Sequence, residues 1–144
     1  MKLIRFTAAM LLAVSLPAQT LNHHRTPGVV ALTDTKTICS TVWGKDVRHV
    51  SKSMKKEVCL AYGIMRGCPG PKYEIDHLIS RELGGADDIR NLWPQPISDA
   101  RQKDHVEKFL HVQVCKGKIS LPVAQKQIAE NWRTVKLPSS GSEK

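Results

Sequence analysis

The chain has 144 residues, and 22 lysines and arginines against 13 aspartates and glutamates give it a formal net charge of +9. Hydrophobic residues make up 41% of the sequence and charged residues 24%, values that argue against a wholly disordered, collagen-like or multi-span membrane protein. The length predicts one domain, and the basic surplus favours a polyanionic partner, either nucleic acid or anionic lipid.

Residues 1–20 have the features of a secretory signal peptide. Lys2 and Arg5 form a positive start, and an apolar run follows from Phe6 to Leu16. An anchoring helix is the alternative, but the run is much shorter than the ~20 residues that span a bilayer. We therefore predict a secreted or periplasmic protein without stable membrane association, whose mature chain has a formal charge of +7 because two bases are removed.

The remaining chain divides into a domain and two ends. Residues 21–36 are polar and predict a flexible leader, and residues 137–144 predict a flexible tail. The domain is expected over residues 37–136, and we expect it to be monomeric.

Four cysteines lie in the mature chain. In an oxidising compartment an even number of cysteines favours two disulfides. A zinc site is the alternative, but no C-x-x-C pair is present. Four cysteines allow three pairings. We expect Cys59–Cys68, which closes a short local loop, and Cys39–Cys115, which joins the N-terminal part to a C-terminal helix.

Hydrophobic periodicity predicts an α+β fold. We expect a helix over 51–62, a strand over 72–79, a Gly84-Gly85 loop and a short apolar segment over 89–93 that Pro94 and Pro96 stop. Two helices follow, one capped by Ser98 and running to about Cys115, the other from about Ser120.

Residues 72–92 contain five acids against three bases, a local charge of −2 within a basic chain. Acids gain nothing near a polyanion unless they hold a cation. Carboxylates with one imidazole suit Mg²⁺ or Mn²⁺, and less often Zn²⁺. Asp76 and His77 therefore indicate phosphodiester hydrolysis, in which the imidazole takes a proton from water. An ordinary half-buried strand histidine beside a turn acid is the structural alternative.

The run YEIDHLISRELGGADDIRNLWPQP from Tyr73 to Pro96 resembles the HNH nuclease motif. More closely, the chain resembles a group of small secreted bacterial HNH-like proteins, whose pattern can be followed from Asp76 to Trp132. The resemblance implies a small ββα-metal core with additional helices, one divalent cation, and cleavage of nucleic acid.

The resemblance also implies a role for individual residues. His77 matches the general base, Asp76 a metal-holding carboxylate, and Asn91 the brace of the loop that carries the base. Asp99 is the best match to the third signature position and would supply a second metal ligand, with His105 as the alternative. Asp99 departs from the pattern, which has His or Asn there.

Basic residues outside the acidic stretch are candidates for contact with substrate phosphates. Their spacing would place several on one side of a helix, and the set is Arg48, Lys52, Lys55 and Lys56. Lys103 either pairs with Asp99 or approaches phosphate. A solvated, solubilising face is the alternative for all five.

We therefore expect a metal-dependent endonuclease of low sequence specificity, acting on DNA rather than RNA. Two alternatives stay open. One is a catalytically inactive nucleic-acid-binding module on the same fold, and the other is a secreted structural protein whose acids hold a stabilising ion.

Overall fold

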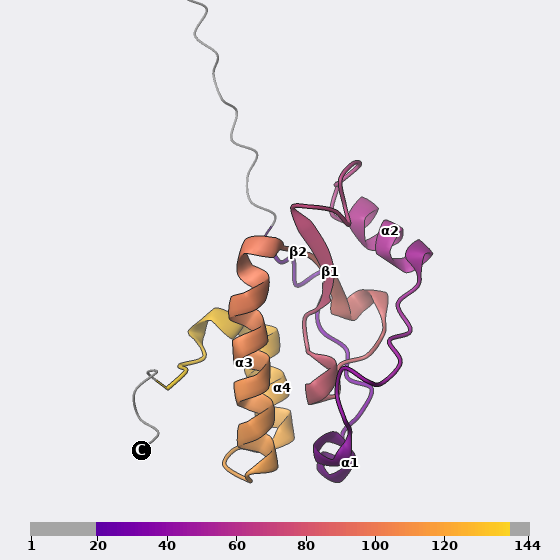
Figure 1. Ribbon diagram of the computed structural model, residues 1–144. Helices are drawn as coiled ribbons and strands as arrows, with labels where there is room; N and C mark the ends of the chain where they lie inside the picture. The colour runs from indigo at the N-terminus through magenta and orange to yellow at the C-terminus, as the bar shows by residue number, and fades with distance from the viewer. Residues whose placement is uncertain (1–19, 139–144) are drawn as a thin grey trace, which may run out of the picture.

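The computed structural model describes residues 20–138 (Figure 1). The predicted signal peptide up to residue 19, and the predicted tail from residue 139, lie outside the described residues. The chain is mixed α+β, as its pattern predicts, with one two-stranded sheet. Its elements are α1 (Thr35–Ser40), α2 (Lys52–Ala61), β1 (Tyr73–His77), the short helices η1 (Arg81–Leu83) and η2 (Ile89–Asn91), β2 (Leu92–Pro96), α3 (Ile97–Cys115), α4 (Leu121–Asn131) and η3 (Trp132–Thr134).

The sheet is an antiparallel pair in which Asp76 lies opposite Trp93 and His77 lies opposite Leu92. β2 continues through Pro94 and Pro96, where the sequence predicted a stop. Backbone N–H groups alternate in direction along a strand, so two prolines that are two residues apart both lack the N–H on the same edge. In a two-stranded sheet that edge has no partner, and proline is tolerated there.

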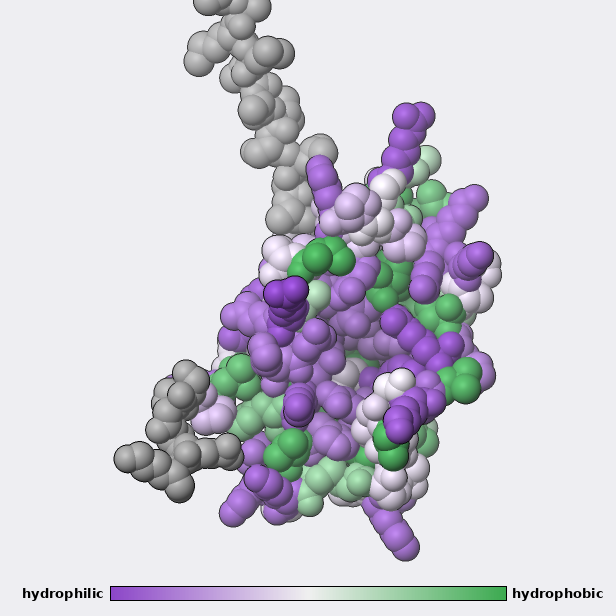
Figure 2. Space-filling model, viewed as in Figure 1, coloured by the Kyte–Doolittle hydropathy of each residue, from purple (hydrophilic) through white to green (hydrophobic). Residues whose placement is uncertain are grey.

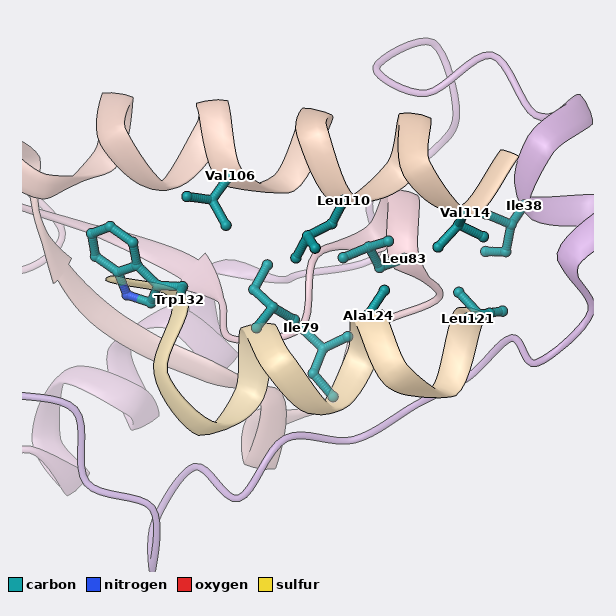
Figure 3. Close-up of a cluster of buried hydrophobic side chains, with 10 residues drawn as sticks. Ile38, Ile79, Leu83, Val106, Leu110, Val114, Leu121, Ala124 and Trp132 are labelled. Atoms are coloured by element: carbon teal, nitrogen blue, oxygen red, sulfur yellow. The ribbon is translucent and has the colours of Figure 1, made fainter. Parts of the chain in front are cut away.

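The sheet separates two hydrophobic clusters. On one side Ile75 and Leu92 pack against Val58 and Cys59 of α2. On the other side α3 and α4 enclose the larger cluster with residues from the loop after β1 (Figure 3). The buried members of this larger cluster are Ile38, Ile79, Leu83, Val106, Leu110, Val114, Leu121, Ala124, Ile128 and Trp132.

The helices α2, α3 and α4 agree with their predicted ranges to within a few residues. The hydroxyl of Ser51 caps α2 by accepting a hydrogen bond from the Met54 N–H at 3.1 Å. α3 differs in its start, because it begins at Ile97 and Ser98 is not its cap. β2 leads directly into α3, so Pro96 occupies the cap position without a side-chain hydrogen bond.

The prediction of a flexible leader over residues 21–36 is not what the structure shows. The Thr26 side chain is fully buried, and its hydroxyl donates to the Leu92 carbonyl at 2.9 Å. Val30 forms a β-bridge with Gly85, and α1 begins at Thr35. The segment is held by backbone hydrogen bonds to the loop after β1, among them the Ala31 N–H to the Gly84 carbonyl at 2.8 Å and the Ala86 N–H to the Val29 carbonyl at 2.9 Å. Hydrophobic periodicity cannot detect such bonds.

Both expected disulfides are formed. Cys39 joins Cys115 across 76 positions, which ties α1 to the end of α3, and Cys59 joins Cys68 across 9 positions. Within residues 20–138, none of the helices is both long and apolar enough to cross a bilayer.

The two disulfides should contribute unequally to stability. In the chain-entropy model, a longer closed loop removes more freedom from the unfolded chain. Replacing Cys39 and Cys115 with alanine should therefore lower the free energy of unfolding by about 4 kcal/mol, against about 2.5 kcal/mol for the Cys59 and Cys68 pair. Urea unfolding of both double variants measures the difference, and an equal or reversed loss would contradict the loop-length account.

Candidate functional site

The C-terminal end of β1 opens into a pocket of about 390 Å³. Asp76 and His77 are adjacent on the strand, and regular pleating would direct them to opposite faces. Both nevertheless line this pocket, because β1 ends at His77. The other lining residues come from the loop before α2, the turn after β1 and one side of α3: Trp43, Gly44, Asp46, Arg48, Ser80, Arg81, Glu82, Asp104 and Glu107.

His77 is paired with Asp87. The residue is 4% exposed, and Nε2 lies 2.7 Å from Asp87 Oδ1. Burial lowers the pKa of His77, the hydrogen bond to Asp87 opposes that shift in part, and the charge of Arg48 adds to it. The ring is therefore neutral at pH 7. With Asp87 holding the Nε2 proton, the lone pair lies on Nδ1, which has no hydrogen-bond partner among residues 20–138.

Asp87 is itself held in place from two sides. The backbone N–H of His49 donates to Oδ2 at 2.5 Å, and Arg81 Nε lies 3.6 Å from Oδ1. Burial alone would raise the pKa of Asp87, but the hydrogen bonds from His49 and His77 outweigh it and lower that pKa. Asp87 is thus an ionised partner that can stabilise a protonated His77 ring.

The turn after β1 brings Asp87 back toward His77. Gly84 adopts a left-handed conformation at φ 84°, and a Cβ on Gly85 would lie 1.8 Å from the Ile79 carbonyl oxygen. Both glycines are therefore required by the backbone path, the first by its conformation and the second by a close approach.

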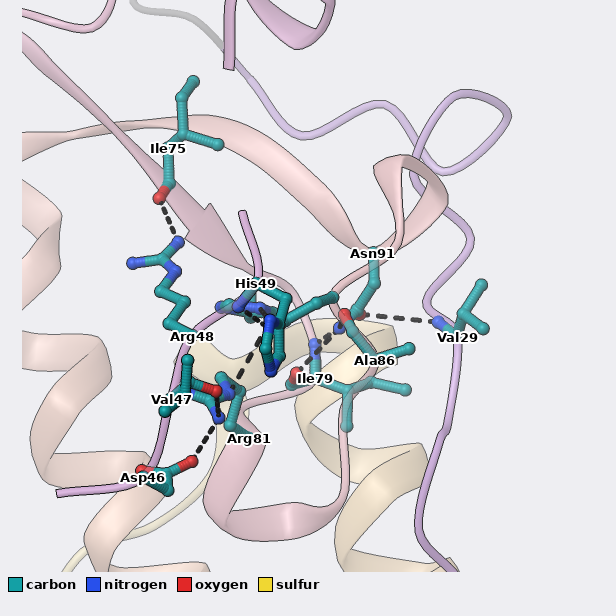
Figure 4. A network of polar contacts seen from close by, with 12 residues as sticks. Val29, Asp46, Val47, Arg48, His49, Ile75, Ile79, Arg81, Ala86 and Asn91 are labelled. Atoms are coloured by element: carbon teal, nitrogen blue, oxygen red, sulfur yellow. Dashed lines mark hydrogen bonds and ion pairs between the residues drawn. The ribbon is translucent and has the colours of Figure 1, made fainter. Parts of the chain in front are cut away.

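Asn91 braces this turn, as the resemblance implies. Its amide is fully buried, donates to the carbonyls of Ile79 and Ala86 at 3.0 Å each, and accepts from the Ile79 N–H at 3.0 Å (Figure 4). The Val29 N–H is a further donor at 3.4 Å. Asn91 does not line the pocket, so it is a positioning residue rather than one that touches a substrate.

Asp76 is paired with a lysine of α3. Lys103 is 1% exposed, and its Nζ lies 2.7 Å from Asp76 Oδ2 and 2.6 Å from the His77 carbonyl oxygen. The same ammonium contacts Glu107 one helical turn further on. The prediction that Lys103 either pairs with Asp99 or approaches phosphate is thus wrong, since its three donors are used inside the protein.

Burial and charge act in opposite directions on this ion cluster. Burial on its own would lower the pKa of Lys103, but Asp76 and Glu107 outweigh it and raise that pKa, so the lysine is charged. Burial raises the pKa of Glu107 to about 7, against the opposing charge of Lys103 and with the further charge of Asp76.

Asp76 and Asp99 do not come together as a pair of metal ligands. Asp99 lies in the first turn of α3, does not line the pocket, and pairs with Arg133. The alternative His105 is exposed on α3 and lines a different hollow. Residues 20–138 contain no group of three or more histidine, cysteine or acidic side chains placed to hold a metal ion. The predicted ligand pair, Asp76 with Asp99, therefore does not fit the single Mg²⁺, Mn²⁺ or Zn²⁺ ion that the resemblance implies, because each carboxylate is paired with a base of the chain.

Arg48 is the predicted phosphate contact that reaches the pocket. Its guanidinium donates to the Ile75 carbonyl at 2.6 Å, while the residue as a whole is exposed (Figure 4). Arg81 also lines the pocket, but it is tied to Asp46 and to the Val47 carbonyl. The other predicted contacts, Lys52, Lys55 and Lys56, lie on α2, do not line the pocket, and form no ion pair among the described residues.

Several side chains of the pocket were not singled out from the sequence. Asp87 was counted among the acids of the motif but not as the partner of His77, and the Gly84-Gly85 turn is the signal that could have paired them. Glu107 stands four residues after Lys103, which is the spacing of an ion pair on a helix. Ser80 gave no signal. Its hydroxyl is buried without a hydrogen-bond partner at the edge of the pocket.

Comparison of the chain with protein-family models, curated proteins and solved structures finds no match. Functional conclusions therefore depend on the geometry of the pocket and on the chemistry of its residues.

Replacing Asn91 with alanine should destabilise the fold. It leaves three buried backbone groups of the turn without partners, which is expected to cost about 3 kcal/mol in the free energy of unfolding. Asn131→Ala is the matched control, because that exposed amide caps only η3 and its loss should cost about 1 kcal/mol or less. Urea unfolding compares the two, and similar losses would mean that Asn91 is not a brace.

Proposed function

We propose that this protein cleaves phosphodiester bonds of nucleic acid, with His77 as the general base. The observation that carries the proposal is the His77–Asp87 pair at the pocket, with Nε2 bound to a carboxylate and His77 among the residues that line the pocket. A neutral imidazole oriented by an ionised acid is the arrangement that general-base catalysis requires.

The chemistry is hydrolysis by an activated water. Nδ1 of His77 takes a proton from the water while the water oxygen bonds to phosphorus and the phosphorus–oxygen bond of the leaving group breaks. Asp87 stabilises the imidazolium that results, and the leaving oxygen is protonated by solvent. Arg48 is the cation at the pocket with guanidinium donors to spare for a phosphate oxygen.

The order of elements supports the proposal. The strand β1 ends in the base, a glycine turn follows, and β2 leads directly into α3. This is the order that the resemblance to HNH nucleases implies for a ββα-metal core, and we propose that core for residues 73–115. Asp76 and Asp99 are each paired with a base of the chain, so the proposed hydrolysis is carried out by protein side chains alone.

The surface is suited to a polyanion. The face seen in Figure 2 is covered mainly by hydrophilic side chains, and its hydrophobic residues form small separate areas. Contacts from lysines of α2 to phosphates would give binding without base readout, and hence low sequence specificity. We propose DNA as the substrate ahead of RNA, and a monomeric enzyme.

The disulfides indicate an oxidising compartment. Together with the predicted signal peptide, they support secretion or export to the periplasm.

A binding module without turnover is the second candidate. The observation that favours it is the pairing of Asp76 with Lys103, which occupies a carboxylate that the nuclease motif assigns to a metal ion.

The general base can be tested with two histidine variants. His77→Gln should lower plasmid and single-stranded DNA cleavage by about 10²-fold or more. His105→Gln should leave cleavage unchanged, because that ring is exposed outside the pocket. The rate should rise with pH through the pKa of His77, which lies below its ordinary value of about 6.5, and should be level at pH 7. Salt-sensitive binding without cleavage in any variant would support the binding module instead.

The lysines of α2 can be tested through the salt dependence of binding. Each phosphate contact on duplex DNA contributes about 0.9 to the slope of log K against log salt. Lys52, Lys55 and Lys56 changed together to glutamine should therefore lower that slope by about 2.7. The control changes Lys116 and Lys118, which follow α3, and Lys126 on α4, none of which lines the pocket. An equal effect there would mean that α2 is not the contact surface.

A further inference from the structure

We propose that the Lys103 ammonium is a built-in cation that takes the position of a divalent metal ion, so that the site acts on nucleic acid without a bound metal. The inference rests on the proposed function for the identity of the site. Its central measurement is metal binding, which is independent of activity.

The surroundings of Lys103 are those of a cation site. Three oxygen atoms meet at Nζ: one from Asp76, one from the Glu107 carboxylate and the His77 carbonyl oxygen. They come from the last two residues of β1 and from α3, which are the elements that converge on the pocket. Two carboxylates and a carbonyl are ligands that Mg²⁺ and Mn²⁺ prefer.

All three N–H donors of the Lys103 ammonium are hydrogen-bonded at this site. A lysine has three N–H donors and no acceptor, and here each donor has an oxygen partner. With 1% of the residue exposed, the charge cannot be transferred to water without moving α3. A divalent ion on the same oxygens would stand within a few ångströms of a positive charge held in a poorly solvated place, which is strongly unfavourable.

The other acids around the pocket do not offer a second site. Asp99 pairs with Arg133, and Asp87 is used by His77 and Arg81. Glu82 and Asp104 line the pocket, but the described residues hold no group of three potential ligands. The cation that can meet a phosphate in the pocket is Arg48, while Lys103 compensates the acids behind it.

The test is Mn²⁺ binding by the oxidised full mature protein, followed by electron paramagnetic resonance and calorimetry. We expect wild type to have no Mn²⁺ site that depends on Asp76, so Asp76→Asn alone should leave any Mn²⁺ binding unchanged. Lys103→Ala should bind one Mn²⁺ at least about tenfold more tightly than wild type, because it frees Asp76 and Glu107. Adding Asp76→Asn to that variant should remove the gain. Lys108→Ala is the control, since this lysine is exposed on the same helix and away from the pocket.

Mn²⁺ bound by wild type and lost in Asp76→Asn would overturn the inference. It would also be overturned by a folded Lys103→Ala variant with no gain in affinity. The wild-type comparison decides alone if Lys103→Ala does not fold.

Cleavage in the presence of EDTA separates the inference from the proposed function. Cleavage that persists supports both, and cleavage that stops without Mg²⁺ or Mn²⁺ overturns the inference while leaving the hydrolysis. If no cleavage occurs under any condition, the proposed function fails and the Mn²⁺ measurements still decide the role of Lys103.

Discussion

The buried amide of Asn91 is the contact on which the pocket depends. It joins Ile79, at the start of the turn after β1, to Ala86, near the end of that turn, and reaches Val29 in the N-terminal segment. Because Asn91 has no exposed surface, water cannot replace its hydrogen bonds to these backbone groups. Because the turn is closed in this way, Asp87 returns to the end of β1 and meets His77. The N-terminal segment is ordered against the same turn for the same reason.

Lys103 performs a comparable task between the sheet and α3. A buried ion cluster is weak evidence for stability, since desolvation of the charges offsets much of their attraction. The ion cluster instead positions α3 against the sheet, because the Lys103 ammonium binds the Asp76 side chain and the His77 backbone carbonyl at the end of β1. Lys103 thereby fixes the position of α3 along its axis relative to the end of β1. Burial raises the pKa of Glu107 to about 7, because the charge of Lys103 opposes that rise only in part and the charge of Asp76 adds to it.

Features with a periodic or local signal could be predicted from the sequence. The three longer helices α2, α3 and α4 and the first strand follow from apolar spacing, and two disulfides follow from four cysteines in a chain with a predicted signal peptide. The leader could not, because Thr26 and Val30 are held by bonds to backbone groups far away in sequence. His77 and Asn91 follow from the motif, but Asp99 was chosen by its distance along the chain from His77. Asp99 and Lys103 lie one turn apart on the same side of α3, so their position along the helix, and not the direction of their side chains, decides which of them reaches the end of β1.

The acidic stretch over residues 72–92 therefore has a different meaning from the one its composition suggests. Three of its five acids are paired with basic side chains of the chain: Asp76 with Lys103, Asp87 with His77 and Arg81, and Asp88 with Arg90. Glu74 and Glu82 have no ion-pair partner among the described residues, and burial raises the pKa of each. Acids that are already compensated exert little net attraction on an external cation. The same compensation lowers the repulsion that a phosphate would meet on approaching Arg48, so one arrangement makes the pocket less attractive to a metal ion and more accessible to a polyanion.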